Sequence, residues 1–369
     1  MSDTHTSVAR QVKQTLHLWV LSVRDMLASA GPVLLLALGL LGAAYWWLDP
    51  QPPRTVTLAT GPAGFSPSAL WTDLQGHDAT LLLGQIRAPR TLGAALVGAL
   101  LGLSGALAQG LFRNALADPY LLGSASGAGL GVVLVLAAAS LGGGYVSLST
   151  VVWIERVGLV SAAFIGALAG VAMTLSLARG AVQTLRLLLA GVVVGVLLGA
   201  ISDLITVASP DALRGKQAFM LGSTSFLGWS ALALMAAGLA LLLALSRRHA
   251  RALDALTLGE DSAVSLGLDL GRVRLVLVLM LSLGTALAVS QAGLVAFVGL
   301  VAPHLVRRHA PGRHGWLLMA SAGMGASLLL AADVISRALV APEELPVGVV
   351  TAVLGGGYLF WLLRQRTSS

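Results

Sequence analysis

Residues 87–131 read RAPRTLGAALVGALLGLSGALAQGLFRNALADPYLLGSASGAGLG. The run at 91–112 contains no charged residue, a polar break follows at 113–119, and a second apolar run starts at Tyr120. Small residues recur every three or four positions, at Gly98, Gly102, Gly105, Gly123, Gly127 and Gly131. Such spacing allows helix backbones to approach closely where lipid supplies no hydrophobic force between them. The stretch therefore predicts two closely packed membrane helices joined by a tight turn.

The composition of the whole chain places it among integral membrane proteins. Of 369 residues, 56% are hydrophobic and only 11% are charged, and the mean hydropathy is +0.86. Soluble domains carry about 25% charged residues, and a soluble chain this apolar would expose large hydrophobic patches. The absence of cysteine excludes disulfides and thiolate metal sites. The net charge of +7 is explained by loop asymmetry in a membrane protein more simply than by nucleic-acid binding.

Apolar runs along the chain predict an all-α fold with ten membrane spans, each needing about 20 residues. The spans are expected at 27–48, 90–111, 119–140, 157–178, 187–208, 226–246, 274–291, 293–306, 316–337 and 346–363. The first is too long for a signal peptide and has no cleavage site after it. The eighth is short and contains Pro303, so it is not expected to cross fully as a helix.

Basic residues predict the orientation of these spans. If both termini lie on one side, 16 of the 23 lysines and arginines fall on that side. The positive-inside rule then makes both termini cytoplasmic. The expected domain organisation is a cytoplasmic N-terminal segment at 1–26 and one ten-span domain at 27–366. That domain includes an outer loop at 49–86 and a cytoplasmic loop at 247–273.

Four stretches of the chain resemble one family. The first is the opening stretch, and the others are LTLGEDSAVSLGLDLGR at 256–272, GLVAFVGLVAPHLVR at 293–307 and AADVISRALVAPEELPVGVVTAVLGGGYLFWLLR at 331–364. In this order they resemble the FecCD-type permeases of type II ABC importers, which take up haem, ferric siderophores and cobalamin. The resemblance covers about residues 80–366. One departure is Asn114-Ala115, where family members commonly have Asn-Pro.

The resemblance implies that Arg87, Arg90 and Arg337 dock a periplasmic binding protein by pairing with its glutamates. From the residues alone, Arg87 and Arg90 are as well explained as anchors at the membrane interface. Asp333 stands four residues before Arg337, which places both on one helix face. We interpret Asp333 as a local ion-pair partner of Arg337.

The loop at 247–273 is too apolar for a free solvated loop and is better suited to short helices that dock into a partner. The resemblance implies that it couples the permease to the ATPase subunit. The coupling residues expected from the motif are Leu258, Gly259, Glu260, Asp261, Ser262, Leu266 and Gly267.

Two turns on the same side are expected at 113–118 and 180–186. Asparagine and aspartate suit turn chemistry and helix capping, which is the simpler interpretation. The resemblance implies instead a cytoplasmic gate formed by Asn114, Leu116, Thr184 and Leu185. Gly191, Gly195 and Gly199 repeat the small-residue spacing, so they predict close helix packing, on a span that the resemblance places along the pathway.

Other polar residues give weaker signals. Asp203 could be a proton-relay carboxylate, but it has no evident partner in the sequence. His304 follows Pro303 as in the family whatever the cargo, so we assign it a structural role, and His77 stays a weak candidate for haem contact. No catalytic constellation is present, and a membrane enzyme has no support. The only lysines, Lys13 and Lys216, are not part of a P-loop.

The sequence therefore predicts a non-catalytic permease of the bacterial inner membrane that binds no metal, cofactor or nucleic acid itself. Its expected partners are a second copy, two ATPase chains that use ATP and Mg, a periplasmic binding protein and the lipid bilayer. Haem is favoured as cargo over ferric siderophores and cobalamin. The rival class is a proton-coupled secondary carrier, which would need intramembrane relays and no docking loop.

Overall fold

The computed structural model describes residues 88–141, 148–180, 183–340 and 343–366, together with Gln85 and a two-stranded pair within the predicted loop 49–86. In that pair, β1 (Thr60–Gly61) runs antiparallel to β2 (Gly64–Phe65). Several predictions lie outside the described residues. They are the segment 1–26, the span 27–48, most of the loop 49–86, His77 and Arg87.

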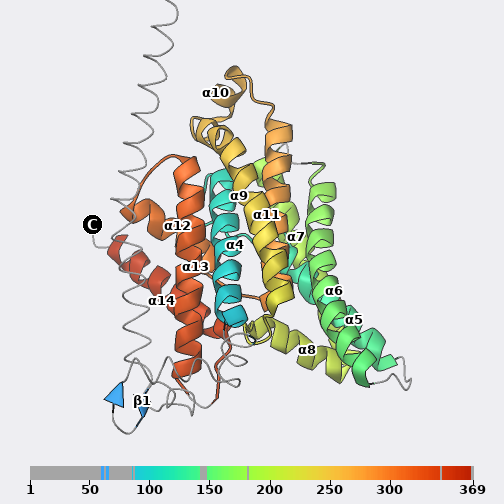
Figure 1. Cartoon of the computed structure of the whole chain (residues 1–369). Coiled ribbons are helices and arrows are strands. Elements are labelled where there is room, and N and C mark those ends of the chain that lie inside the picture. The colour runs from blue at the N-terminus through green and yellow to red at the C-terminus, as the bar shows by residue number, and fades with distance from the viewer. Residues whose placement is uncertain are drawn as a thin grey trace, which may run out of the picture.

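The described part of the chain is otherwise helical (Figure 1). Its helices are α4 (Ala88–Phe112), α5 (Ser124–Leu141), α6 (Leu148–Leu177), α7 (Thr184–Ala208), α8 (Pro210–Leu221), α9 (Trp229–Thr257), α10 (Glu260–Ser265), α11 (Leu270–Ala292), α12 (Val298–His309), α13 (His314–Ala338) and α14 (Val347–Arg366). Within this part, six helices are long and apolar enough to cross a membrane: α4, α6 from Val157, α7, α9, α11 and α13. The structure therefore supports a multi-pass membrane protein.

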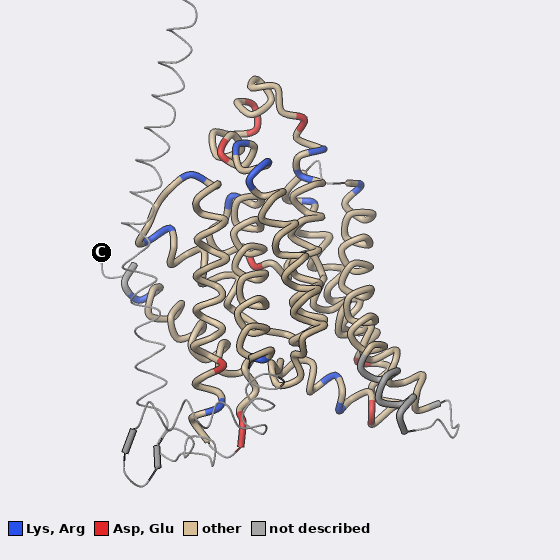
Figure 2. Tube along the Cα trace, viewed as in Figure 1, with Lys and Arg blue, Asp and Glu red and all other residues tan. Residues whose placement is uncertain are grey.

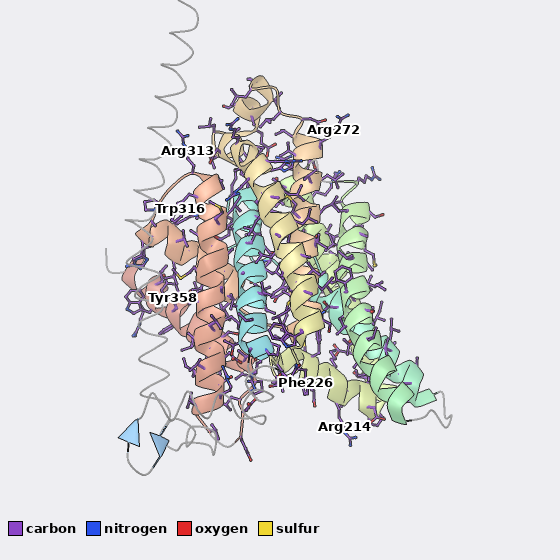
Figure 3. The ribbon with its side chains drawn as sticks, viewed as in Figure 1. Arg214, Phe226, Arg272, Arg313, Trp316 and Tyr358 are labelled. Atoms are coloured by element: carbon purple, nitrogen blue, oxygen red, sulfur yellow. The ribbon has the colours of Figure 1, made fainter. Side chains whose placement is uncertain are left out.

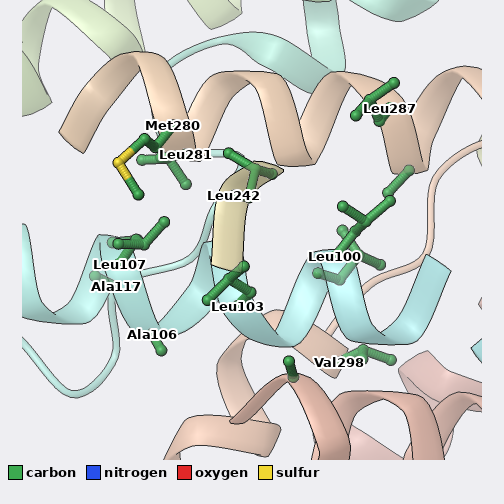
Figure 4. Packing of buried hydrophobic residues seen from close by; sticks show 14 of the residues in the cluster. Leu100, Leu103, Ala106, Leu107, Ala117, Leu242, Met280, Leu281, Leu287 and Val298 are labelled. Atoms are coloured by element: carbon green, nitrogen blue, oxygen red, sulfur yellow. The ribbon is translucent and has the colours of Figure 1, made fainter. Parts of the chain in front are cut away.

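Helix α4 is the centre of the molecule. Every residue from Val97 to Phe112 is buried, and the helix packs against α9, α11, α12 and α13. A Cβ atom at Gly105 would lie 1.7 Å from the carbonyl oxygen of Gly299, so these two backbones touch. Larger apolar side chains fill the remaining space, as Figure 4 shows for Leu100, Leu103, Leu107, Leu242, Met280 and Leu281. The glycines of the opening stretch do allow close helix contacts, but the predicted pairing was wrong. Helices α4 and α5 pack mainly on other helices and not on each other, because the turn between them directs α5 toward α6, α7 and α8.

A second group of helices stands beside this core. Helix α5 packs against α6, α7 and α8, and Gly127 meets the backbone of Gly166 across the α5–α6 contact. Helix α7 is buried along one stripe only, and the side chains of Leu189, Val193 and Val196 on its other face are exposed. This chain leaves much of α7 uncovered.

Helix α8 was not predicted, although the sequence carries its start signal. The Ser209 hydroxyl accepts a hydrogen bond from the Ala212 N–H at 3.3 Å, Pro210 occupies the first helical turn, and Asp211 follows it. Serine at the N-cap followed by proline is a typical helix start. The helix ends at Gly222, where φ is +66°. It is too short to be found by a search for membrane spans.

Two predicted boundaries were wrong for local reasons. The span expected from residue 119 begins as a helix only at Ser124, because residues 113–123 form a turn whose Pro119 packs against Gly299. The loop expected from residue 247 begins as a continuation of α9, which runs to Thr257. Residues 247–257 are mostly alanine, leucine and arginine, which are strong helix formers.

The seventh and eighth spans are separate helices as predicted, although the second of them begins five residues later than the predicted residue 293. Helix α11 ends at Ala292, and α12 begins at Val298 with Pro303 inside it. At 12 residues, α12 is about 18 Å long, well short of the roughly 30 Å hydrocarbon core. The expectation that this segment does not cross fully as a helix is confirmed.

The two ends of the molecule differ in charge. Most arginines of the described residues gather at the end that carries α10, here called the α10 end (Figure 2). Arg272 and Arg313 are visible there in Figure 3, whereas Arg214 and Phe226 lie at the opposite end, here called the α8 end. This asymmetry follows the predicted sides of the membrane.

Candidate functional site

A buried carboxylate organises the α8 end. Asp333, on α13, is fully buried and accepts hydrogen bonds from Arg90 and Arg337, with the Arg337 Nη2 to Oδ2 distance at 2.6 Å. The Thr224 hydroxyl also donates to it. Arg90 donates in addition to both carboxylate oxygens of Glu344, at 2.8 and 2.9 Å. We call Arg90, Thr224, Asp333, Arg337 and Glu344 the Asp333 cluster.

The Asp333 cluster connects four segments of the chain. Arg90 stands at the start of α4, Asp333 and Arg337 lie in the last turns of α13, Thr224 follows α8, and Glu344 precedes α14. Buried charges are tolerated when they are paired and hydrogen-bonded, and Asp333 meets both conditions. The local Asp333–Arg337 ion pair expected from the sequence is confirmed at 2.6 Å.

The predicted docking arginines differ in accessibility. The side chain of Arg90 is 11% exposed and that of Arg337 is 28% exposed. The hydrogen bonds from Arg90 lower the pKa of Glu344, against an opposing effect of burial. Arg90 is therefore held inside the protein by two carboxylates, while Arg337 presents more of its side chain to the surface.

At the α10 end, the expected coupling residues form a projecting segment at 258–267. Ala263 of α10 is fully buried against the bundle, whereas Leu258 and Leu266 are 67% and 65% exposed. Asp261 and Ser262 are also exposed. Because the segment projects beyond the ends of the long helices (Figure 1), these apolar side chains form a surface suited to a protein partner.

Two glycines shape this segment through their backbone conformation. Gly259 and Gly267 have φ of +108° and +84°, and a Cβ atom at either would meet nothing within 4 Å. Side chains other than glycine are disfavoured at such φ values. Glycine is therefore required at these positions by the backbone conformation of the turns at either end of α10, and not by a lack of room for a side chain.

The two predicted gate turns lie in different surroundings. In the first, the Asn114 Oδ1 accepts the Leu116 N–H at 2.9 Å, so Asn114 stabilises the turn itself and caps no helix, and Leu116 is 56% exposed. In the second, Thr184 is the first residue of α7 and Leu185 is 70% exposed. Both leucines are available to contact something outside this chain.

The three glycines of α7 differ in their packing. A Cβ atom at Gly191 would lie 2.1 Å from the Leu121 carbonyl oxygen, whereas one at Gly195 would lie 3.7 Å from Ser126 Oγ. At Gly199 it would meet no atom of the described chain within 4 Å. Close packing within the chain thus explains Gly191 only.

Sequence reasoning missed three interactions. Glu344 was overlooked, although it stands seven residues after Arg337 in a loop rich in acid residues. Lys216 on α8 pairs with Asp203 on α7, so the carboxylate that had no evident partner has one. Gln109 donates to the Leu300 carbonyl at 3.1 Å and accepts from Arg307. No sequence spacing indicated the last two, since each pair depends on tertiary packing.

His304 contacts an aromatic ring. Its ring centroid lies 5.9 Å from that of Tyr358 in an edge-on arrangement, and Figure 3 shows Tyr358 on α14. Within the described residues, no group of three or more metal-binding side chains is found.

These features define a helical multi-pass membrane protein with a charged cluster at one end and a projecting apolar segment at the other. The model of the FecCD transport family matches residues 55–365. The chain belongs to this family, the permease family of type II ABC importers.

Individual relatives agree with this assignment. The hemin transport system permease protein HmuU of Yersinia pestis is 40% identical over 284 residues, 76% of this chain and 83% of the relative. The vitamin B12 import system permease protein BtuC of Pectobacterium atrosepticum is 38% identical over 312 residues, covering 84% and 89%. A solved structure, described as an inward-facing conformation of a putative metal-chelate type ABC transporter, shares the fold with a TM-score of 0.74. It is 24% identical, and the match covers 91% of this chain and 99% of that one.

Proposed function

We propose that this chain is the membrane subunit of an ATP-driven importer that moves haem from the periplasm to the cytoplasm across the bacterial inner membrane. Two copies form the pathway on a two-fold axis, and two ATPase chains with ATP and Mg drive alternating access. A periplasmic binding protein delivers the cargo. The chain itself performs no catalysis.

The observation that carries this proposal is the projecting segment 258–267. It exposes Leu258 and Leu266 at the end where the arginines gather, which the positive-inside rule makes the cytoplasmic end. An exposed apolar surface outside the membrane needs a protein partner, and a cytoplasmic ATPase is the partner that an importer requires. A proton-coupled carrier needs no such surface.

The opposite end supports docking of a binding protein. Arg90 and Arg337 are joined there by Asp333, and Arg87 lies three residues before Arg90. Charged groups at such a surface guide docking and raise the association rate more than the final affinity. With the α10 end cytoplasmic, this end is periplasmic.

Helix α7 supports a homodimer. Its uncovered face carries Leu189, Val193 and Val196, and a Cβ atom at Gly199 would meet nothing within 4 Å among the described residues. A second copy that packs on this face would place the exposed Leu116 and Leu185 near the axis, where they form the cytoplasmic gate with Asn114 and Thr184. The ten-span topology with both termini cytoplasmic is completed by the span at 27–48 and by the shorter helices α5, α12 and α14.

The cargo assignment has the least structural support. Haem is favoured because HmuU, named as a hemin permease, is 40% identical to this chain. Cobalamin and ferric siderophores fit the same architecture, and BtuC of Pectobacterium atrosepticum is 38% identical.

The test is uptake by proteoliposomes that contain the purified permease, its ATPase and its binding protein. Haem, cobalamin or a ferric siderophore is added in turn with the binding protein on the periplasmic side, and ATP is supplied on the side of the ATPase. Haem accumulation well above the other two supports the cargo assignment, whereas preferential uptake of cobalamin or siderophore overturns it and leaves the importer class intact.

A further inference from the structure

At the α10 end, one carboxylate joins three segments that are distant in sequence. Glu260, the first residue of α10, lies 2.6 Å from Arg274 Nη2 and 3.2 Å from Arg113 Nη2, and both distances are measured to its Oε1. Arg274 belongs to the first turns of α11, and Arg113 directly follows α4. We call these three residues the Glu260 cluster.

The two arginines of the Glu260 cluster differ in burial. The side chain of Arg274 is 3% exposed, whereas those of Arg113 and Glu260 are 42% and 41% exposed. Removing the partner of a buried charge is costly, while an exposed ion pair contributes little and is screened by salt. Glu260 is therefore fixed to α11 by Arg274, and its contact with Arg113 is the one that can break and re-form.

Arg113 also has an unusual backbone. Its φ is +49°, in the left-handed region that residues other than glycine rarely adopt. The Asn114 N–H donates back to the Gln109 carbonyl at 3.2 Å, and the Ala117 N–H donates to the Asn114 carbonyl at 3.1 Å. The end of α4 and the turn at 113–118 are thus one hydrogen-bonded unit, so a displacement of Arg113 moves the whole turn.

We infer that Glu260 is a positioning residue that transmits the movement of α10 to the turn at 113–118 through Arg113, with Arg274 as its anchor. This inference rests on the proposed function, in which α10 docks on the ATPase and Asn114 and Leu116 belong to the gate. It adds a division of roles within the projecting segment. Glu260 contacts the helix bundle through Arg113 and Arg274, and the exposed Leu258 and Leu266 contact the ATPase.

The experiment compares Arg113→Gln, Glu260→Gln and the double variant in the complete complex in proteoliposomes. Cargo taken up per ATP hydrolysed is measured together with the amount of assembled complex. Arg113→Gln is the decisive variant, because it keeps the Glu260–Arg274 ion pair. Its result therefore remains interpretable even if Glu260→Gln fails to fold. Arg214→Gln is the matched control, since it makes the same substitution in another exposed ion pair, that of Arg214 with Asp211 on α8, and Arg214 is not among the docking, gate or coupling residues.

The inference predicts that Arg113→Gln lowers uptake per ATP by about 2- to 30-fold, the range expected for residues that couple two sites. Complex assembly should be unchanged, Arg113→Lys should restore most of the ratio, and the double variant should be no worse than Glu260→Gln alone. A purely structural role would lower uptake and ATP hydrolysis together and leave their ratio unchanged, which would overturn the inference. Equal uptake per ATP hydrolysed in the wild type and in Arg113→Gln would also overturn the inference. Absence of ATP-dependent uptake in the wild type would contradict the proposed function instead.

Discussion

The Arg90 guanidinium and the Asp333 carboxylate meet at 3.2 Å although 243 residues separate them in the chain. The contact joins the start of the central helix α4 to the end of α13. Asp333 also pairs with Arg337, so one buried carboxylate holds two arginines that the family resemblance assigns to docking. If these arginines dock a binding protein as proposed, the same carboxylate serves both stability and docking.

Replacement of Asp333 by asparagine should destabilise the protein strongly. Breaking a buried ion pair by removing one partner costs about 3–5 kcal/mol, and Asp333 serves two arginines and Thr224. Thermal unfolding in detergent measures the effect. Glu343→Gln is the matched control, because Glu343 is an exposed carboxylate beside the same cluster, and equal melting temperatures for the two variants would contradict the role of Asp333.

Charge reversal should have different effects at Arg337 and at Arg87. Arg337→Glu would place two carboxylates together and destabilise the fold as well as docking, because Arg337 pairs with the buried Asp333. Arg87→Glu should weaken binding of the periplasmic protein, mainly through a slower and more salt-dependent association. Surface plasmon resonance at low and high salt measures both rates, and unchanged association for Arg87→Glu would exclude Arg87 from the docking surface.

The ion pair of Glu344 predicts a defined pH dependence of stability. Hydrogen bonds from Arg90 lower the pKa of the Glu344 carboxyl group in the folded state below its ordinary value of 4.5. A carboxyl group with a lowered folded pKa contributes stability above its unfolded pKa and loses it as the pH falls through the folded value. The difference in melting temperature between wild type and Glu344→Gln should thus be constant from pH 8 to pH 5 and shrink below pH 4.5. A difference that changes between pH 8 and pH 5 would assign the effect to another group.

Gly259→Ala should impair coupling without preventing membrane insertion. At φ +108° an alanine is strained although the surrounding space is open, with a cost of about 1–3 kcal/mol for such backbone conformations. The start of α10 would shift, and ATP hydrolysis should then proceed with less uptake per ATP. Gly271→Ala is the control, because Gly271 lies within α11 without a positive φ and a Cβ atom there would make only an ordinary contact with Asp269. Equal coupling in the two variants would mean that the conformation of Gly259 is not required.

The glycine contact between α4 and α12 should tolerate no side chain. A Cβ atom at Gly105 would approach the Gly299 carbonyl oxygen to 1.7 Å, and both partners are backbone, so Gly105→Ala must separate the helices. We expect a marked loss of folded protein in size-exclusion chromatography. Gly323→Ala should behave as wild type in this assay, since a Cβ atom at this exposed position of α13 would meet nothing within 4 Å among the described residues. Normal yield of Gly105→Ala would show that the helices can part at little cost.

Much of the fold could be predicted because membrane helices can be recognised in a sequence by their length and apolar composition. The span of α4 and its close helix contacts followed from the uncharged run at 91–112 and its glycines, and the short α12 followed from Pro303. The partners of α4 did not follow, because glycine spacing marks a close contact without saying which helix makes it. Helix α8 was missed because a search for 20-residue spans overlooks an amphipathic helix, although Ser209 and Pro210 marked its start.

The site was predicted only where its residues are close in sequence. Asp333 and Arg337 are one helical turn apart, and their pairing was foreseen. The contacts of Arg90 with Glu344, of Lys216 with Asp203 and of Glu260 with Arg113 span 254, 13 and 147 residues. Such pairs depend on which helices pack together, and the spacing of residues along one helix does not show this.

The central claim is that this chain imports its cargo by coupling to an ATPase, and the energy source tests it most directly. Haem uptake is measured in proteoliposomes with the ATPase and binding protein, once with ATP and no proton gradient and once with a proton gradient and no ATP. The account predicts accumulation only with ATP, and only when all three components are present. Accumulation by the permease alone, driven by the proton gradient, would contradict it.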